Sequence, residues 1–156
     1  MKRNTLLVTL LAGVLSTLFI GCGTTPVGTP VRIPGVIECE TATGKLSHLV
    51  APTVVQADKD FKITFHTYGG GSKSKGGEEV YITENNATVE VYDFTTATSL
   101  SSVCTMQLKL FPHTVTLRFA KPGEAIIKIV GQREVNSGIW RRRSFVREHR
   151  LMVTGE

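Results

Sequence analysis

Phe61-Lys62-Ile63-Thr64-Phe65-His66 alternates apolar and polar side chains at every step, and this stretch decides the fold. Since successive side chains of a strand point to opposite faces of a sheet, the alternation predicts a half-buried β-strand. No segment beyond residue 22 combines a helical apolar stripe with a cap. Similar alternation predicts further strands in segments 46–55, 79–83, 88–94, 105–110, 114–119, 124–130 and 144–153. Seven or eight short strands of this kind indicate an all-β fold, an antiparallel sandwich of two layers.

A tight turn is expected between two of these strands, at Lys121-Pro122-Gly123-Glu124. Proline fixes φ at the second position and glycine accepts a positive φ at the third. Residues 111–131 read FPHTVTLRFAKPGEAIIKIVG, and this strand, Pro-Gly corner and strand resemble part of a bacterial Ig-like domain. Residues 51–68 resemble another strand pair of such domains. The resemblance implies an Ig-like sandwich outside the cytoplasm and implies no activity.

The N-terminus has the order of a secretory signal peptide. Lys2 and Arg3 precede a mainly apolar run from Leu6 to Ile20, which small residues follow. A helix of roughly 15 residues spans about 23 Å, which is less than the ~30 Å hydrocarbon core of a bilayer. The run therefore suits a leader that is removed better than a permanent membrane span.

The leader ends in Leu18-Phe19-Ile20-Gly21-Cys22, which resembles the lipobox of bacterial lipoprotein precursors, although Phe19 departs from the usual leucine. The resemblance implies cleavage between Gly21 and Cys22, a diacylglyceryl thioether on Cys22, and usually acylation of the new amino group, for example with palmitate. More than one acyl chain gives stable anchoring. The alternative is an unmodified cysteine at the start of a secreted chain.

Three regions follow from these features: a signal peptide at 1–21, a lipidated cysteine and flexible tether at 22–45, and an Ig-like domain at 46–156. The tether begins GTTPVGTPVRIPG at Gly23, which is rich in proline and glycine and has no hydrophobic period. Gly23 after the cysteine favours, by analogy with lipoproteins, the outer membrane of a cell with two membranes. In a cell with one membrane, the outer face of the plasma membrane is expected.

Cys39 and Cys104 remain as an even pair once Cys22 carries lipid. In an oxidising compartment we expect a disulfide between them. Closing a loop of ~65 residues would stabilise the fold by on the order of 4 kcal/mol in the chain-entropy model. The alternative is two isolated thiols, because the spacing of the cysteines matches no zinc or redox motif.

Positive charge is concentrated near the C-terminus. The formal charge is +5, yet six arginines against Glu134 and Glu148 make segment 133–150 alone +4: Arg133, Arg141, Arg142, Arg143, Arg147 and Arg150. Clustered arginines bind phosphate and carboxylate groups, so the segment is a candidate patch for an anionic wall or lipid polymer, or for an acidic envelope protein. The alternative is that the charges protect a sheet edge from pairing. A nucleic-acid partner is not expected, since no recognition motif is present.

Catalytic, metal and cofactor sites are not expected. The four histidines are scattered, the acidic residues form no evident pair, and no nucleophile elbow is present: the histidines are His48, His66, His113 and His149. We therefore expect a membrane-anchored envelope lipoprotein that acts as a non-catalytic binding or structural accessory module. The alternative is an Ig-like protease inhibitor, and the oligomeric state stays open.

Overall fold

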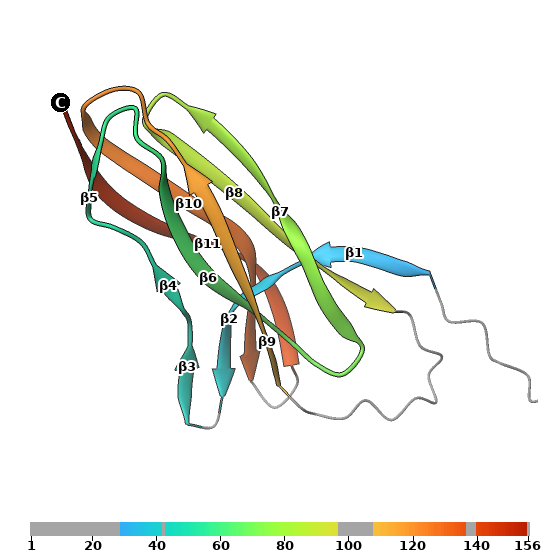
Figure 1. Cartoon of the computed structure of the whole chain (residues 1–156). Coiled ribbons are helices and arrows are strands. Elements are labelled where there is room, and N and C mark those ends of the chain that lie inside the picture. The colour runs from blue at the N-terminus through green and yellow to red at the C-terminus, as the bar shows by residue number, and fades with distance from the viewer. Residues whose placement is uncertain (1–28, 42, 97–107, 137–139, 156) are drawn as a thin grey trace, which may run out of the picture.

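Strands make up all the regular structure that can be described. The computed structural model describes residues 29–41, 43–96, 108–136 and 140–155, which form eleven strands in two sheets (Figure 1). Within these ranges no helix occurs, and so none that could cross a membrane. The prediction of an all-β domain is confirmed.

The larger sheet has eight strands and contains the longest ones. Its main path runs β1 (Pro30–Pro34), β8 (Asn86–Thr96), β10 (Gly123–Asn136), β11 (Trp140–Thr154) and β5 (Val54–Gln56). Three more strands join it from the side: β7 (Lys73–Thr83) pairs with β8, β2 (Val36–Thr41) pairs with β10, and β3 (Gly44–Leu46) pairs with β2.

The smaller sheet covers one face of the larger sheet. Its three strands lie in the order β4 (Leu49–Val50), β6 (Phe61–Gly69) and β9 (Lys109–Leu117), and all pairs are antiparallel. β6 contains the alternating stretch that begins at Phe61, and Ile63 and Phe65 point into the core as the alternation predicts.

The expectation of a purely antiparallel sandwich is wrong for the larger sheet, which is mixed. β10 runs parallel to β8 and to β2, and β11 runs parallel to β5. Between β8 and β10 the chain passes through β9 in the other sheet, and such a crossover returns the chain in the same direction.

The tether is also shorter than expected, because residues 30–41 belong to the larger sheet. β1 pairs with β8, β2 pairs with β10, and Gly35 between them bonds to both neighbours. Its N–H donates to the carbonyl of Val91 at 3.0 Å, and its carbonyl accepts from Gln132 N–H at 2.8 Å. The expected domain start at residue 46 is therefore corrected to about residue 30.

Glycine is required where these strands cross. A Cβ on Gly131 would lie 2.6 Å from the carbonyl oxygen of Gly35, and a Cβ on Gly35 would lie 2.8 Å from Cγ2 of Thr67. Both positions face inward. The carbonyl of Gly35 is held by its bond to Gln132 N–H, and Oγ1 of Thr67 is held by Asp93 and His113. The expected turn at Lys121–Glu124 also needs glycine, because Gly123 adopts a positive φ of 129°.

The core lies between the two sheets and changes character along the sandwich. The half near the C-terminus is apolar, with large side chains such as Phe65, Leu117, Phe119, Ile127 and Ile129 fully buried. The half near the end of β10 contains a small second cluster of Val36, Cys39 and Tyr68, together with buried polar residues: Glu38, Thr67, Lys73, Asp93 and His113. This polar half is where a functional site is to be sought.

Candidate functional site

Of the residues expected to be cleaved, lipidated or joined in a disulfide, only Cys39 lies within the described residues. Gly21, Cys22 and Cys104 lie outside the described residues, so cleavage, lipid attachment and the disulfide remain predictions. Cys39 lies in β2, is 4% exposed and carries a free thiol. Burial, with Glu134 nearby, raises the pKa of that thiol.

The six candidate arginines do not form one patch, because the two strands that carry them alternate their faces. Arg133 lies opposite Arg143 in the β10–β11 register, on the face that further along holds the buried Ile127 and Leu151. Arg141 and Arg147 share this inner face. Arg142 and Arg150 point to the outer face, so the predicted group divides into four and two.

Three of the six are neutralised by carboxylates. Arg150 pairs with Glu124 at 2.9 Å, Arg142 approaches Glu134 at 3.5 Å, and Arg133 forms a close ion pair with Glu38. The guanidinium of Arg147 contacts the hydroxyl of Ser47.

Glu38 is the most enclosed of these carboxylates, with a side chain 7% exposed. It contacts Lys45 at 3.2 Å as well as Arg133. The contact of Glu38 with Arg133 lacks the direction of a hydrogen bond, since Oε1 and Nε have no hydrogen-bond partner. Arg133 also stacks over Phe145, with 4.0 Å between the guanidinium carbon and the ring centre. These contacts fasten β2 and β3 to the β10–β11 hairpin.

Arg141 and Arg143 remain. Both are exposed, and neither forms an ion pair with any residue that the structure describes. They occupy the end of the β10–β11 hairpin, where neighbouring strands also end. We call this region the arginine end: β10 beyond Gln132, β11 before Ser144, the β2–β3 hairpin, and the first residues of β7 and β9.

Charge is unequal between the two ends of the sandwich. The described residues of the arginine end have an excess of four positive charges, from Lys45, Lys73, Lys109, Arg133, Arg141, Arg142 and Arg143 against Glu38, Glu40 and Glu134. The opposite end is balanced by ion pairs, Arg118 with Asp60, Lys121 with Glu84 and Arg150 with Glu124. The positive charge is therefore concentrated at one end of the long axis of the sandwich.

A chain of buried polar groups lies behind the arginine end and joins the two sheets. Oγ1 of Thr67 lies 3.0 Å from Oδ1 of Asp93 and 3.0 Å from Nε2 of His113. Nδ1 of His113 lies 2.5 Å from Oε1 of Glu78. Thr67, Asp93 and His113 are at most 1% exposed, and His113 stacks on Phe65 with ring centres 5.3 Å apart.

The hydroxyl of Thr67 donates to Oδ1 of Asp93, and the N–H of Gly76 approaches the same oxygen at 3.4 Å. Burial is the largest influence on this carboxyl group, and it raises the pKa of Asp93.

Thr67, His113 and Glu78 stand in the order of a hydroxyl, imidazole and carboxylate triad. Because Thr67 and His113 are 0% exposed, no substrate can contact the hydroxyl in this structure. Lys73, 9% exposed, lies nearby, and burial and the charge of Arg142 lower its pKa. We interpret this row of contacts as a link between the two sheets and call it the polar clasp: Thr67, Asp93, His113 and Glu78.

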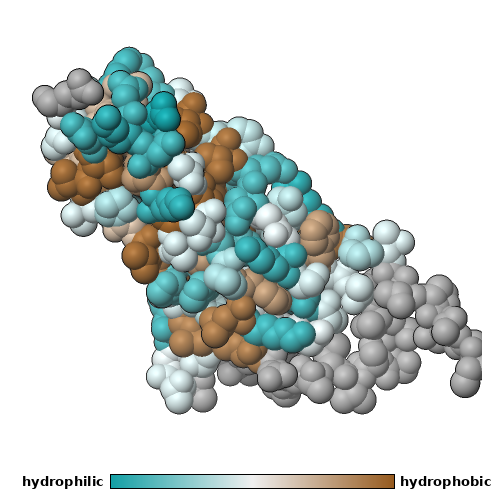
Figure 2. Space-filling view, viewed as in Figure 1, coloured by the Kyte–Doolittle hydropathy of each residue, from teal (hydrophilic) through white to brown (hydrophobic). Residues whose placement is uncertain are grey.

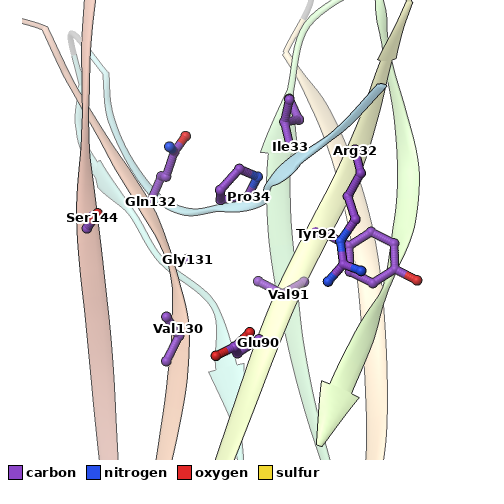
Figure 3. A pocket seen from close by; sticks show the side chains of 10 residues that line it. All are labelled: Arg32, Ile33, Pro34, Glu90, Val91, Tyr92, Val130, Gly131, Gln132 and Ser144. Carbon is purple, nitrogen blue, oxygen red and sulfur yellow. The ribbon is translucent and has the colours of Figure 1, made fainter. Parts of the chain in front are cut away.

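A groove on the outer face of the larger sheet is the other recess of interest, with a volume of about 420 Å³. It lies where β1 turns away from β8 toward β10. Figure 3 shows Arg32 and Tyr92 on one side and Gln132 and Ser144 on the other. The guanidinium of Arg32 stacks 3.8 Å from the ring centre of Tyr92 and pairs with Glu79 at 2.6 Å. The groove has room for a small ligand, but its arginine is already paired.

The rest of the described surface carries exposed hydrophobic side chains and a pair of stacked histidines. On the face shown in Figure 2, hydrophobic side chains lie in separate groups among hydrophilic ones. Throughout the described ranges no three histidine, cysteine or acidic residues gather as metal ligands. His48 and His66 do stack, with ring centres 4.2 Å apart, and burial lowers the pKa of His66.

The sequence predicted the basic segment, and the structure reduces it to Arg141 and Arg143. The sequence analysis missed the polar clasp, although the alternation pattern of residues 87–93 contained a signal of it. Asp93 shares its parity with Ala87, Val89 and Val91 in a predicted strand, so an acidic residue was due to face the core.

Comparison of the chain with protein-family models, with curated proteins and with solved structures finds no match.

Proposed function

We propose that this chain is a lipid-anchored lipoprotein of the cell envelope whose β domain is a non-catalytic binding module for an anionic partner. The leader and Gly21-Cys22 support the anchor. The observation that carries the binding role is the exposure of Arg141 and Arg143 without carboxylate partners among the described residues, on a hairpin that β2 and β3 brace.

The bracing explains why these arginines suit binding better than edge protection. Arg133 and Arg142 are already paired, so their charges hold the hairpin in shape. Arg143 lies opposite Arg133 and Arg141 lies nearer the tip of the hairpin, and neither pairs with a carboxylate among the described residues. A guanidinium held on rigid structure loses less freedom when it binds a phosphate or carboxylate.

We also propose that the two-sheet fold is of the Ig-like kind. The support is the strand, Pro-Gly corner and strand at residues 111–131, together with a two-sheet core. The parallel pairs of β10 would then be a variation within that fold.

The protease-inhibitor alternative gains little support from the geometry. Such an inhibitor presents neighbouring loops to an active-site cleft, and Gly69-Gly70-Gly71 resembles a glycine loop of this kind only weakly. Gly69 instead belongs to β6 and packs against Phe111 and Lys73, which leaves only a short turn between β6 and β7.

The anchor is tested by labelling cells with a radioactive fatty acid. We expect label on the chain and its recovery in the membrane fraction, and expect both to be lost in Cys22→Ser. Equal labelling of Cys22→Ser and the native chain would overturn the anchor.

The binding role is tested by co-sedimentation of the detergent-solubilised lipoprotein with envelope fractions across a salt series. The double variant Arg141→Gln, Arg143→Gln should bind several-fold more weakly, and salt should weaken the native protein. The control Arg118→Gln, Arg150→Gln removes equal charge from the opposite end and should bind like the native protein. Equal loss in both variants would show that net charge matters and the arginine end does not.

A further inference from the structure

The N-terminal end of the described domain lies at the arginine end. Pro30 pairs with Thr96, the last residue of β8. β8 and β10 run parallel, so the end of β8 and the β10–β11 hairpin lie at the same end of the sheet. Figure 1 shows the C-terminus at the opposite end. The chain that leads back to Cys22 therefore joins the domain at the same end of the sheet as Arg141 and Arg143.

The connection from Cys22 to Pro30 is short compared with the domain. Eight steps of at most ~3.6 Å allow about 29 Å between their Cα atoms. The thirteen steps of β10 from Gly123 to Asn136 span about 44 Å at ~3.4 Å each. If Cys22 is held at a membrane, the domain cannot stand with its opposite end on the surface, because Pro30 would then be out of reach.

We infer that the arginine end of the anchored domain docks on the membrane that holds the anchor, and that Arg141 and Arg143 bind the phosphate groups of anionic phospholipids. The inference rests on the proposed lipid anchor. Two observations carry it: Pro30, where the described domain begins, and the positive excess share one end of the sandwich, and the opposite end is neutral.

The chemistry of the site agrees with this partner. A guanidinium matches the geometry of a phosphate group with two parallel N–H donors. Each basic side chain near an anionic bilayer strengthens attraction about fivefold at physiological salt. The anchor keeps the local concentration of headgroups high, so weak contacts from two arginines suffice to set orientation.

The test is arginine footprinting of the lipidated protein in vesicles. The protein is inserted into vesicles of phosphatidylcholine alone or mixed with phosphatidylglycerol and is treated with phenylglyoxal, and peptide mass spectrometry gives the modification rate of each arginine. In the mixed vesicles, we expect Arg141 and Arg143 to react several-fold more slowly than in phosphatidylcholine. Arg118 and Arg150 at the opposite end are internal controls and should react equally in both.

Three outcomes would overturn the inference. Equal rates at Arg141 and Arg143 in both vesicles would show that the end does not dock. Equal protection by inorganic phosphate, or stronger protection by soluble polyphosphate, with phosphatidylcholine vesicles would assign the arginines to a free anion or a polymer. If the protein leaves both kinds of vesicle, the proposed anchor itself fails and the docking falls with it.

Discussion

At the scale of single residues, the polar clasp shows how burial affects a carboxyl group in a folded core. Asp93 is 1% exposed, and Oδ2 of its carboxyl group has no hydrogen-bond partner. Thr67 and Gly76 approach only Oδ1. Burial therefore raises the pKa of Asp93, and the carboxyl group resists ionisation.

Asp93 should make stability depend on pH in an unusual direction. The ordinary value is 3.8, so as pH rises above it the unfolded chain releases this proton before the folded chain does. The contribution of Asp93 to the free energy of unfolding should then fall until its folded pKa is passed. Urea titrations from acid to neutral pH should show the native protein losing stability relative to Asp93→Asn, whose amide resembles the protonated acid.

Asp60 provides a control of opposite sign. Its exposed carboxyl accepts a hydrogen bond from Arg118, which lowers its pKa. The native protein should gain stability relative to Asp60→Asn over the same rise in pH. A difference between native protein and Asp93→Asn that does not change with pH would contradict the assignment.

Gly131 offers a steric prediction. In Gly131→Ala the new Cβ would meet the carbonyl oxygen of Gly35 at 2.6 Å, and that oxygen is fixed by its bond to Gln132 N–H. We expect a loss of about 1–3 kcal/mol in the free energy of unfolding, as for other overpacked cores. Gly70→Ala, with no heavy atom within 4 Å of its Cβ, should change stability by less than about 0.5 kcal/mol. Equal stability of the two variants would contradict the close approach.

At the residue scale, the sequence predicted which side chains of a strand face the core, but it did not predict which residues they contact. Alternation places Ile63 and Phe65 inside, and the structure agrees. The contacts of Asp93 with Thr67 and of His113 with Glu78 depend on how the two sheets are aligned, and no local pattern contains that alignment.

At the scale of elements, the β2–β3 hairpin is held to β10 by a mostly buried ion pair. Arg133 and Glu38 lie in neighbouring parallel strands, where Arg133 is the register partner of Glu38. Removing one partner leaves the other without its counter-charge in an enclosed site.

A double-mutant cycle should detect this coupling. We expect Arg133→Gln to destabilise the fold by about 1–2 kcal/mol, discounted because the arginine is one-third exposed, and the addition of Glu38→Gln to recover part of the loss. Arg118→Gln, which breaks an exposed pair, should cost less than about 1 kcal/mol. Additive losses across the cycle would show that the pair does not fasten β2.

Most strands could be predicted from alternation, and the N-terminal ones could not. Segments 61–66, 79–83, 88–94, 124–130 and 144–153 all lie within strands. β1 falls in segment 23–35, whose prolines and glycines and missing hydrophobic period predict a tether, and proline within sheets is confined mostly to edges and strand ends. It pairs with β8 despite the two prolines that bound it, a position that only the full sheet reveals.

At the scale of the whole molecule, the corrected boundary changes what counts as a domain. β2 contributes the buried Val36 and Ile37, so residues 30–41 complete the core. The two-layer arrangement could be predicted because strand patterns are local. The domain boundary could not, because β1 and β2 pair with strands far along the chain, β8 and β10.

Truncation should separate the two boundaries. A chain that begins at residue 46 would leave residues 92–96 of β8 and 132–134 of β10 without their partners on one side, and we expect it to lack cooperative unfolding in urea. A chain that begins at residue 29 should unfold cooperatively, with a midpoint near that of the lipidated protein. Circular dichroism through the titration checks both, and cooperative unfolding of the shorter chain would restore the boundary at residue 46.

The hydrogen bonds of Gly35 to Val91 and Gln132 also determine when during synthesis the larger sheet can form. The first strands of the chain pair with strands that are synthesised later, β1 with β8 and β2 with β10, so the larger sheet cannot close while residues 123–136 are still being made. Such long-range pairing is slow to form and leaves sheet edges open meanwhile. The larger sheet therefore closes late, and a helper that shields its open strands until then would raise the yield of folded protein.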